Sequence, residues 1–334
     1  MAREPGPAGA PTRKRLPVNG QALATIAKAA LPSPADLTRH LPFPLRPASV
    51  PDGVEPQKAE SRTGVHFDTE WARSYPARAA RVLLVEGVVR PSMTALAAPI
   101  VLGTDRLADF EGPAVFAANH HSHIDTPLLL SVIPEPWRHH MAIGAAADYF
   151  FGNRVTGTLS ALVIGAIPIE RTKINRKSAD DAAALIADGW SFLIFPEGGR
   201  SPDGWGQPFR GGAAYLSLRC EVPVIPIYVG GTTRILRKGK KLPKLSVTRI
   251  VFGHPLWPRE DEDSRAFALR IEDAVSALGD EGRTDWYSAR RRVHAGDVPS
   301  MRGPAAGDWR KAWDLGDRTP IRRRQERAWP DLGR

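Results

Sequence analysis

The sequence has little cysteine and no long apolar run. Its single cysteine, Cys220, cannot form a disulfide within the chain, which excludes a disulfide-stapled secreted domain and fits a reducing cytoplasm. A membrane-spanning helix needs about 20 apolar residues. The best candidate segment, Val82–Leu102, is interrupted by two charged residues and two prolines: Glu86, Arg90, Pro91 and Pro99. The first residues also lack the apolar core of a secretory signal. We therefore expect a soluble or peripherally bound protein.

Acidic residues are outnumbered by basic ones. The 46 Lys and Arg residues against 36 Asp and Glu give a formal net charge of +10, which favours an anionic partner. Basic residues are dense at 237–244 and again beyond Arg283, where tryptophans are interleaved. We expect these segments to seat the protein on an anionic membrane surface; the alternative is a solvated loop and tail. No DNA- or RNA-binding module is recognisable, so nucleic acid is not expected as a partner.

Composition divides the chain into four segments. Residues 1–65 are rich in proline and alanine and bury too little apolar surface to offset the entropy of ordering, which predicts a mostly disordered arm. The other segments are an N-terminal helical extension, a catalytic domain, and a C-terminal helix with a basic tail, at 66–105, 106–258 and 259–334. A helix is predicted over 71–89, with Pro91 ending or kinking it. This helix either packs on the main domain or lies at a membrane interface.

Between residues 106 and 258, short apolar runs alternate with helical patterns. The predicted strands are Ala114–Ala118, Leu162–Ile169, Phe192–Phe195, Val224–Val229 and Ser246–Phe252. The predicted helices are Thr126–Val132, Ser178–Asp188 and Gly212–Leu218, followed by Ser264–Leu278. This alternation predicts an α/β fold with a mixed, largely parallel sheet flanked by helices.

The segment from Asn119 to Asp125 follows a predicted strand and precedes a predicted helix. Open α/β sheets place their ligands at the carboxyl ends of strands. His120 is a natural general base near neutral pH, and a carboxylate bonded to its other ring nitrogen would fix its tautomer. Residues five apart share no helix face, so His120 and Asp125 meet only if the chain turns at Ser122. The alternative is that Asp125 merely caps the helix.

A second alternative uses the same segment to bind metal. His121, His123 and Asp125 have the spacing that begins the ligand motif of metallo-β-lactamase-type hydrolases, and two imidazoles with a carboxylate suit zinc. That motif continues with a histidine directly after the aspartate, and Thr126 stands there instead.

Three further segments carry candidate ligand-binding groups. Phe195–Ser201 follows a strand; Gly198 and Gly199 allow close backbone approach to a ligand, and Arg200 offers a bidentate fork for phosphate. Arg171 follows another predicted strand. Val222–Ile227 is apolar, with Pro226 expected to shape the end of a pocket.

Together these segments resemble the four blocks of the glycerophospholipid acyltransferase family, whose best-known members are lysophosphatidic acid acyltransferases. The first block, Asn-His-x-Ser-x-x-Asp, is matched by Asn119, His120, Ser122 and Asp125. The second and fourth blocks are matched by Arg171 and Pro226. The third, Phe-Pro-Glu-Gly-Thr-Arg-Ser, is matched at six of seven positions, with Gly199 replacing the threonine. The resemblance covers roughly residues 106–258.

The resemblance implies an acyltransferase of phospholipid synthesis. His120 would be the general base and Asp125 its orienting partner, with no acyl-enzyme, metal or other cofactor. The remaining predicted site residues are substrate contacts: Asn119, Ser122, Arg171, Glu197, Gly198, Arg200 and Ser201. The implied partners are an acyl thioester donor (acyl-CoA or acyl-carrier protein), a phosphorylated glycerolipid acceptor and the inner face of the cell membrane. Lysophosphatidic acid is the default acceptor; glycerol-3-phosphate, another lysophospholipid or a glycolipid remain open.

Overall fold

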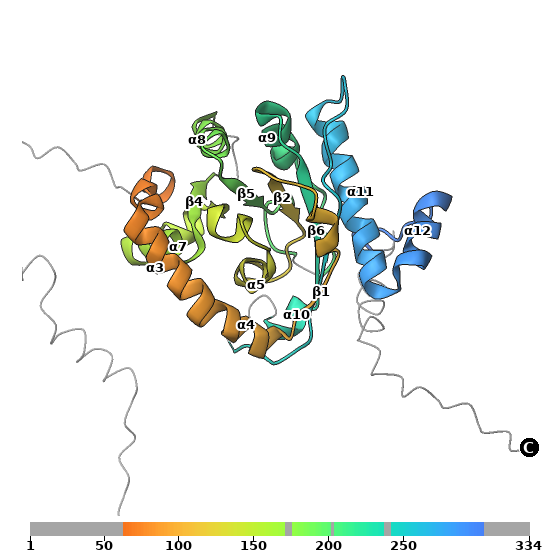
Figure 1. Ribbon diagram of the computed structural model, residues 1–334, viewed down its shortest axis with the longest axis horizontal. Coiled ribbons are helices and arrows are strands. Elements are labelled where there is room, and N and C mark those ends of the chain that lie inside the picture. Colours follow the sequence, from red (N-terminus) through yellow and green to blue (C-terminus); the bar gives the residue numbers. More distant parts are fainter. Residues whose placement is uncertain (1–62, 171–175, 202–203, 237–241, 304–334) are drawn as a thin grey trace, which may run out of the picture. The chain divides into compact units, whose positions relative to one another are not determined.

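The computed structural model describes residues 63–170, 176–201, 204–236 and 242–303 (Figure 1). Their centre is a seven-stranded sheet of order β1-β7-β6-β2-β5-β3-β4. The strands are β1 (Ile100–Leu102), β2 (Val115–Ala118), β3 (Met141–Ala146), β4 (Ala166–Ile169), β5 (Ser191–Ile194), β6 (Val224–Gly230) and β7 (Arg249–Phe252). β2 lies between β5 and β6 and is parallel to both, whereas β6 and β7 are antiparallel. The sheet is therefore mixed and largely parallel, as the sequence predicts.

Helices cover both faces of the sheet. The α-helices are α3 (Tyr75–Leu84), α4 (Arg90–Ala97), α5 (Asp125–Val132), α6 (Ala147–Phe150), α7 (Arg154–Ile164), α8 (Arg176–Ala187), α9 (Gly212–Cys220), α10 (Thr232–Ile235), α11 (Ser264–Arg283) and α12 (Trp286–Ala295). Short η turns occupy Gly64–His66, Glu70–Arg73, Thr104–Leu107 and Trp137–His140, and η3 is a π-helical turn at Val85–Val89. In Figure 1, α8, α9 and α11 lie on one face and α4 and α5 on the other.

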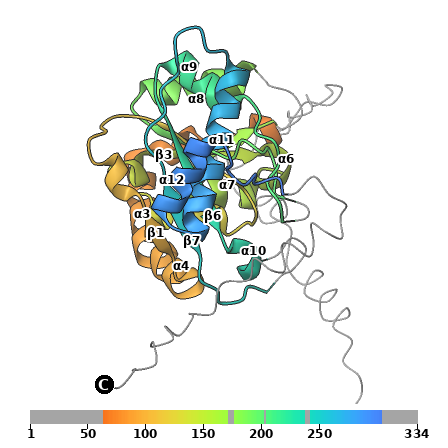
Figure 2. The same ribbon diagram turned by 90° about the vertical axis from the view of Figure 1, so that its right-hand side faces the viewer.

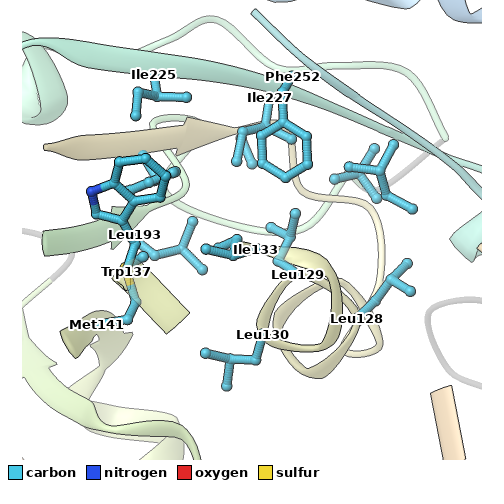
Figure 3. Close-up of a cluster of buried hydrophobic side chains, with 14 of the residues drawn as sticks. Leu128, Leu129, Leu130, Ile133, Trp137, Met141, Leu193, Ile225, Ile227 and Phe252 are labelled. Atoms are coloured by element: carbon cyan, nitrogen blue, oxygen red, sulfur yellow. The ribbon is translucent and has the colours of Figure 1, made fainter. Parts of the chain in front are cut away.

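The central strands are buried on both faces, which explains their continuous apolar sequence. In β2, Val115 and Ala117 join the core under α8, α9 and α11, whereas Phe116 and Ala118 join the core under α4 and α5. Figure 3 shows the second core, where the leucines of α5 lie against side chains such as Ile225 and Phe252. These two packed layers hold the strand ends in fixed register.

The N-terminal helix continues past Pro91, so of the two predicted outcomes, an end or a kink at Pro91, the end does not occur. α3, η3 and α4 follow one another without a break, and Pro91 falls in the first turn of α4. A proline has no N–H to donate to the preceding turn, and here that preceding turn is η3. In η3 the Arg90 N–H bonds the carbonyl of Val85, a π-type spacing. Among the described residues, no helix is both long and apolar enough to span a membrane.

The predicted strand Leu162–Ile169 begins too early. Its first three residues complete α7, which ends at Gly165 with a left-handed φ of 64°, and β4 starts only at Ala166. Buried Arg81 of α3 donates to the carbonyls of Leu162 and Ala161. The end of α7 is thus fixed by a contact from a distant helix, which no local apolar pattern reveals.

The C-terminal part of the described chain packs beside the sheet. α11 begins after Asp263, whose side chain accepts the N–H groups of Arg265 and Ala266, and it covers β6. Figure 2 shows α12 lying over α11. Nearly all of the predicted disordered arm, most of the basic loop at 237–244 and the tail beyond residue 303 lie outside the described residues.

Candidate active site

Three neighbouring strands end at the place where the predicted site residues begin. β2 ends at Ala118 and leads directly into Asn119 and His120, while β5 ends at Ile194 and leads into Phe195. β6, on the other side of β2, leads into α10. Because parallel strands present their carboxyl ends at one edge, the first and third blocks meet there.

His120 and Asp125 form a hydrogen-bonded pair. Nδ1 of His120 lies 2.9 Å from Oδ2 of Asp125, and the same oxygen accepts the N–H groups of His121 and Ser122 at 2.7 Å each. Asp125 opens α5, but its side chain forms no capping hydrogen bond with that helix. Its bonds run back to the turn before it, so the alternative in which Asp125 only caps the helix does not fit.

The surroundings of Asp125 favour its ionised form. Its complete burial opposes ionisation, but the hydrogen bond and charge of His120, with help from His121 and the Ser122 amide, outweigh this and lower the pKa of Asp125. An ionised Asp125 accepts the Nδ1 proton of the His120 imidazole, so Nε2 is the ring atom that can exchange a proton with a substrate. The side chain of His120 itself stays partly exposed, at 16%.

Phe195 fixes the ring of His120 from one side. The two rings stack at 4.1 Å between centroids with an interplanar angle of 23°. Phe195 is the first residue of the third block, directly after β5. The stack and the Asp125 bond together set the direction in which Nε2 points.

Asn119 and Ser122 lie behind the turn and bond to backbone. Asn119 is fully buried; its amide nitrogen donates to the Val229 carbonyl at 2.8 Å and its oxygen accepts the Val229 N–H at 2.7 Å. The Ser122 hydroxyl donates to the Leu236 carbonyl at 2.8 Å. The sequence predicts both as substrate contacts, whereas the structure engages their polar atoms in tying the His120 turn to β6 and α10.

Glu197 and Ser201 connect the two turns. One carboxylate oxygen of Glu197 accepts the His120 N–H and the other accepts the Gln207 N–H, both at 2.9 Å. Burial raises the pKa of Glu197 to about 7, although both N–H groups act against this shift. Ser201 is also buried, and its N–H donates to the His120 carbonyl at 3.0 Å. Both peptide groups of His120 are therefore held by the third block.

Gly198 and Gly199 differ in whether a side chain could replace the glycine. Gly198 has a left-handed φ of 72°, and an added Cβ would lie 3.0 Å from the guanidinium carbon of Arg210. Its N–H donates to the Phe195 carbonyl at 3.0 Å, so this amide closes the turn. Gly199 has no such constraint, because an added Cβ meets nothing within 4 Å. A threonine at this position, as in the third block of the family, would fit.

Of the two arginines predicted to bind phosphate, the structure describes only one. Arg171 lies outside the described residues. Arg200 is half-buried and, within the described part of the chain, forms no hydrogen bond or ion pair, so its fork is available to a ligand. It lies in the same turn as Glu197, whose carboxylate bonds to the backbone of His120.

The structure does not bring the alternative metal ligands together. His123 stacks on Tyr149 and lies 3.1 Å from its hydroxyl through Nε2, and Oδ2 of Asp125 is taken by three donors. Among the described residues, ligand atoms converge only at Glu86, Glu135 and His139. There Arg90 and Arg138 already pair with Glu86.

Several site contacts were missed at the sequence level. Phe195 had a usable signal, because it ends a strand beside the strand that carries His120. No sequence signal identifies the backbone partners Gln207, Val229 and Leu236, because any residue supplies the same peptide groups. Pro226, expected to shape the end of a pocket, lines a cavity of about 770 Å³ bordered by α11 and α12.

The fold and the site define an α/β domain that presents an oriented His–Asp pair at the carboxyl edge of its sheet. Residues 99–230 match the family model described as Acyltransferase. Since this range contains His120, Asp125 and the third-block turn, the domain that holds the site belongs to the acyltransferase family. The resemblance indicated by the four motifs is thereby confirmed.

Two relatives of this chain are also named as acyltransferases. A chloroplastic 1-acyl-sn-glycerol-3-phosphate acyltransferase from Brassica napus, BAT2, is 30% identical over 162 residues, which are 47% of this chain and 44% of the relative. The human 1-acyl-sn-glycerol-3-phosphate acyltransferase beta is 28% identical over 137 residues, 39% of this chain and 45% of the relative. The chain thus spans about half the length of the curated relatives it matches.

A solved structure is also similar. The crystal structure of the 1-acyl-sn-glycerophosphate acyltransferase PlsC from Thermotoga maritima aligns with a TM-score of 0.49 and 21% sequence identity. The alignment covers 65% of this chain and 84% of that chain.

Proposed function

We propose that the protein transfers a fatty acyl group from a thioester donor, acyl-CoA or acyl-carrier protein, to a hydroxyl of lysophosphatidic acid or a related phosphorylated glycerol lipid. The observation that carries the proposal is the bond between Nδ1 of His120 and buried Asp125. The family of the domain and the names of the relatives support the same reaction class.

In the proposed reaction His120 acts as general base. Its Nε2 takes the proton of the acceptor hydroxyl while the oxygen attacks the thioester carbonyl carbon. The tetrahedral intermediate then expels the thiolate, the C–S bond breaks, and the imidazolium returns the proton to the leaving sulfur. Asp125 stabilises the imidazolium while it exists. No acyl-enzyme, metal or other cofactor enters this scheme.

Binding of the acceptor phosphate is assigned to Arg200. Its guanidinium matches a phosphate group in charge and geometry, and its turn is bonded to the His120 turn through Ser201 and Glu197. A phosphate held there would fix the adjacent glycerol hydroxyl relative to His120. Arg171 stays a predicted second phosphate contact.

We also propose that the protein works as a peripheral protein on the cytoplasmic face of the cell membrane. Exposed apolar side chains are present on two helices that pack against each other: Leu83 on α3, and Val155 and Leu159 on α7. Exposed apolar side chains of this kind suit insertion among lipid headgroups. The net charge of +10 favours anionic lipids.

The proposed function is tested by incubating the purified chain with labelled acyl-CoA, with and without lysophosphatidic acid. We expect phosphatidic acid to form only when both substrates and intact His120 are present, and His120→Ala to remove the activity while the protein stays folded. Replacing acyl-CoA by acyl-carrier protein identifies the donor. Glycerol-3-phosphate, other lysophospholipids and a glycolipid are the competing acceptors, with products identified by mass spectrometry.

Two outcomes would overturn this proposal. Acceptor-independent release of the labelled acyl group would make the protein a thioester hydrolase. Near-normal transfer by a folded His120→Ala variant would remove the general base from the mechanism.

A further inference from the structure

The last described residues of the chain pack against the loop that follows the third block. The Met301 carbonyl accepts the N–H of Gly206 at 2.9 Å. A Cβ added to Gly206 would lie 3.1 Å from the Met301 Cβ, and one added to Gly303 would lie 2.5 Å from the ring of buried Trp205. Neither glycine has room for a side chain, so the backbone of each segment lies directly against the other segment.

An ion pair reinforces this contact. The guanidinium of Arg302 binds both carboxylate oxygens of Glu272 on α11, at 2.6 and 2.7 Å. Glu272 is buried, and its Oε2 also accepts the N–H of Phe209 at 3.0 Å. One carboxylate therefore holds the C-terminal segment and the backbone of the 206–209 loop at the same time.

The same loop reaches the proposed catalytic base through one further residue. The Gln207 N–H donates to one oxygen of Glu197, and the other oxygen accepts the N–H of His120. The next turn of the loop is tied to the third block as well, since the Arg210 N–H donates to the Pro196 carbonyl at 2.9 Å. A continuous path of hydrogen bonds and loop backbone thus runs from Arg302 to the backbone of His120.

We propose that Arg302 and Glu272 are positioning residues for His120, acting through the 206–209 loop and the carboxylate of Glu197. This inference rests on the proposed function of His120. Without Arg302, the Glu272 carboxylate loses the guanidinium that orients it, so its bond to the Phe209 N–H is held less firmly. The neighbouring Gln207 N–H is then less firmly fixed at Glu197. His120 then shifts on its turn, and a displacement of about 1 Å in a reacting group reduces a rate by up to about 10²-fold.

The chain offers a matched control on the same helix. Arg292 binds Asp280 of α11 at 2.6 Å, and Asp280 is buried like Glu272. This pair joins α12 to α11, and within the described residues the bonds of Arg292 go to Asp280 and Thr284, not to the 206–209 loop. Arg292→Ala and Arg302→Ala therefore remove the same kind of interaction, and only the second breaks the path to His120.

The experiment compares wild type, Arg302→Ala, Arg302→Lys and Arg292→Ala in the full chain, first by hydrogen exchange measured with mass spectrometry. For Arg302→Ala we expect faster exchange in two segments: residues 204–210, which contain the Gln207 and Phe209 amides, and residues 119–124, which contain the His120 amide. Arg292→Ala should leave both segments as in wild type. Arg302→Lys, which keeps the charge without the fork, should restore part of the protection.

Acyl-transfer kinetics form the second readout. In Arg302→Ala we expect kcat to fall by about tenfold with the KM of both substrates unchanged, because base placement is altered and substrate contacts are not. Arg302→Lys should recover part of kcat, and Arg292→Ala should keep all of it. Equal loss of kcat in both alanine variants would overturn the proposal, since that result indicates general destabilisation.

The exchange data separate this inference from the proposed function. A wild-type protein without acyl-transfer activity would refute the function, while faster exchange at both segments in Arg302→Ala would still support the path to His120. Faster exchange at 204–210 alone, or at neither segment, would overturn the inference even if the wild-type enzyme is active.

Discussion

The Nδ1 atom of His120 lies 2.9 Å from Oδ2 of Asp125, an oxygen that also receives two backbone N–H groups from the same turn. The turn thus folds around the carboxylate, and the histidine ring is oriented by the group that holds the turn together. Asp125 is fully buried at the start of α5, whose leucines pack into the core. The core packing of α5 therefore fixes the position of the pair.

The first prediction concerns Asp125→Asn. An asparagine with its oxygen at the Oδ2 position accepts the same three donors, but it has no charge to stabilise the imidazolium. Its NH₂ group takes the buried Oδ1 position, which has no hydrogen-bond partner among the described residues. We expect kcat to fall by up to about 10⁴-fold, the loss produced by the same change in a Ser-His-Asp triad, with little change in acceptor KM. Steady-state kinetics check this. Asp109→Asn, at an exposed position before β2, is the matched control and should keep full activity.

How much of this site the sequence predicts depends on the range of each contact. The His120–Asp125 pair was predictable because both residues lie in one turn, and the strands that carry the blocks were predictable from their apolar runs. β3 was missed because Met141–Ala146 is rich in alanine and glycine, and its strand conformation depends on pairing with β4 and β5. The bond between Glu197 and the His120 amide joins residues 77 apart, and only the tertiary fold reveals it.

The second prediction concerns Glu197 and pH. Its pKa is raised from an ordinary 4.5 to about 7 because burial disfavours the charge. The carboxyl of Glu197 therefore binds a proton more tightly in the folded state than in the unfolded state. The stabilisation from this difference is fully present below pH 4.5 and is lost as the pH rises through about 7. Relative to Glu197→Gln, which does not titrate, the wild-type free energy of unfolding should fall by about 3 kcal/mol across that window.

Denaturant unfolding of the two proteins at a series of pH values measures this difference. The comparison cancels the opposite contribution of Asp125, whose lowered pKa adds stability above its usual value and loses it in acid. Parallel stability curves for wild type and Glu197→Gln would show that Glu197 titrates normally.

The third prediction concerns Gly199, where this chain departs from the third block of the family. Because an added Cβ meets no atom within 4 Å, we expect Gly199→Thr to fold with an unchanged melting temperature. Its hydroxyl supplies one more hydrogen bond to a bound acceptor, which lowers acceptor KM by about 2–10-fold. Acceptor titrations check this.

Two variants serve as controls for that change. Gly199→Ala adds the Cβ without the hydroxyl and should leave KM as in wild type; an equal fall in KM would assign the effect to packing. For Gly198→Ala we expect the free energy of unfolding to fall by about 1–3 kcal/mol, because position 198 has a left-handed φ and faces Arg210.

The last prediction concerns two exposed apolar side chains, Leu83 on α3 and Leu159 on α7, which are 74% and 54% exposed. If these side chains enter the headgroup region of the membrane, replacing both by aspartate removes apolar burial and adds charge that anionic lipid repels. We expect binding to vesicles of phosphatidylglycerol and phosphatidylcholine, measured by flotation, to weaken by on the order of tenfold or more. Leu269→Asp is the control, because Leu269 is 51% exposed on α11, a helix that packs against β6, β7, α9 and α12. Equal flotation of the double variant and wild type would exclude Leu83 and Leu159 as membrane contacts, and weaker flotation of Leu269→Asp alone would move the membrane contact to α11.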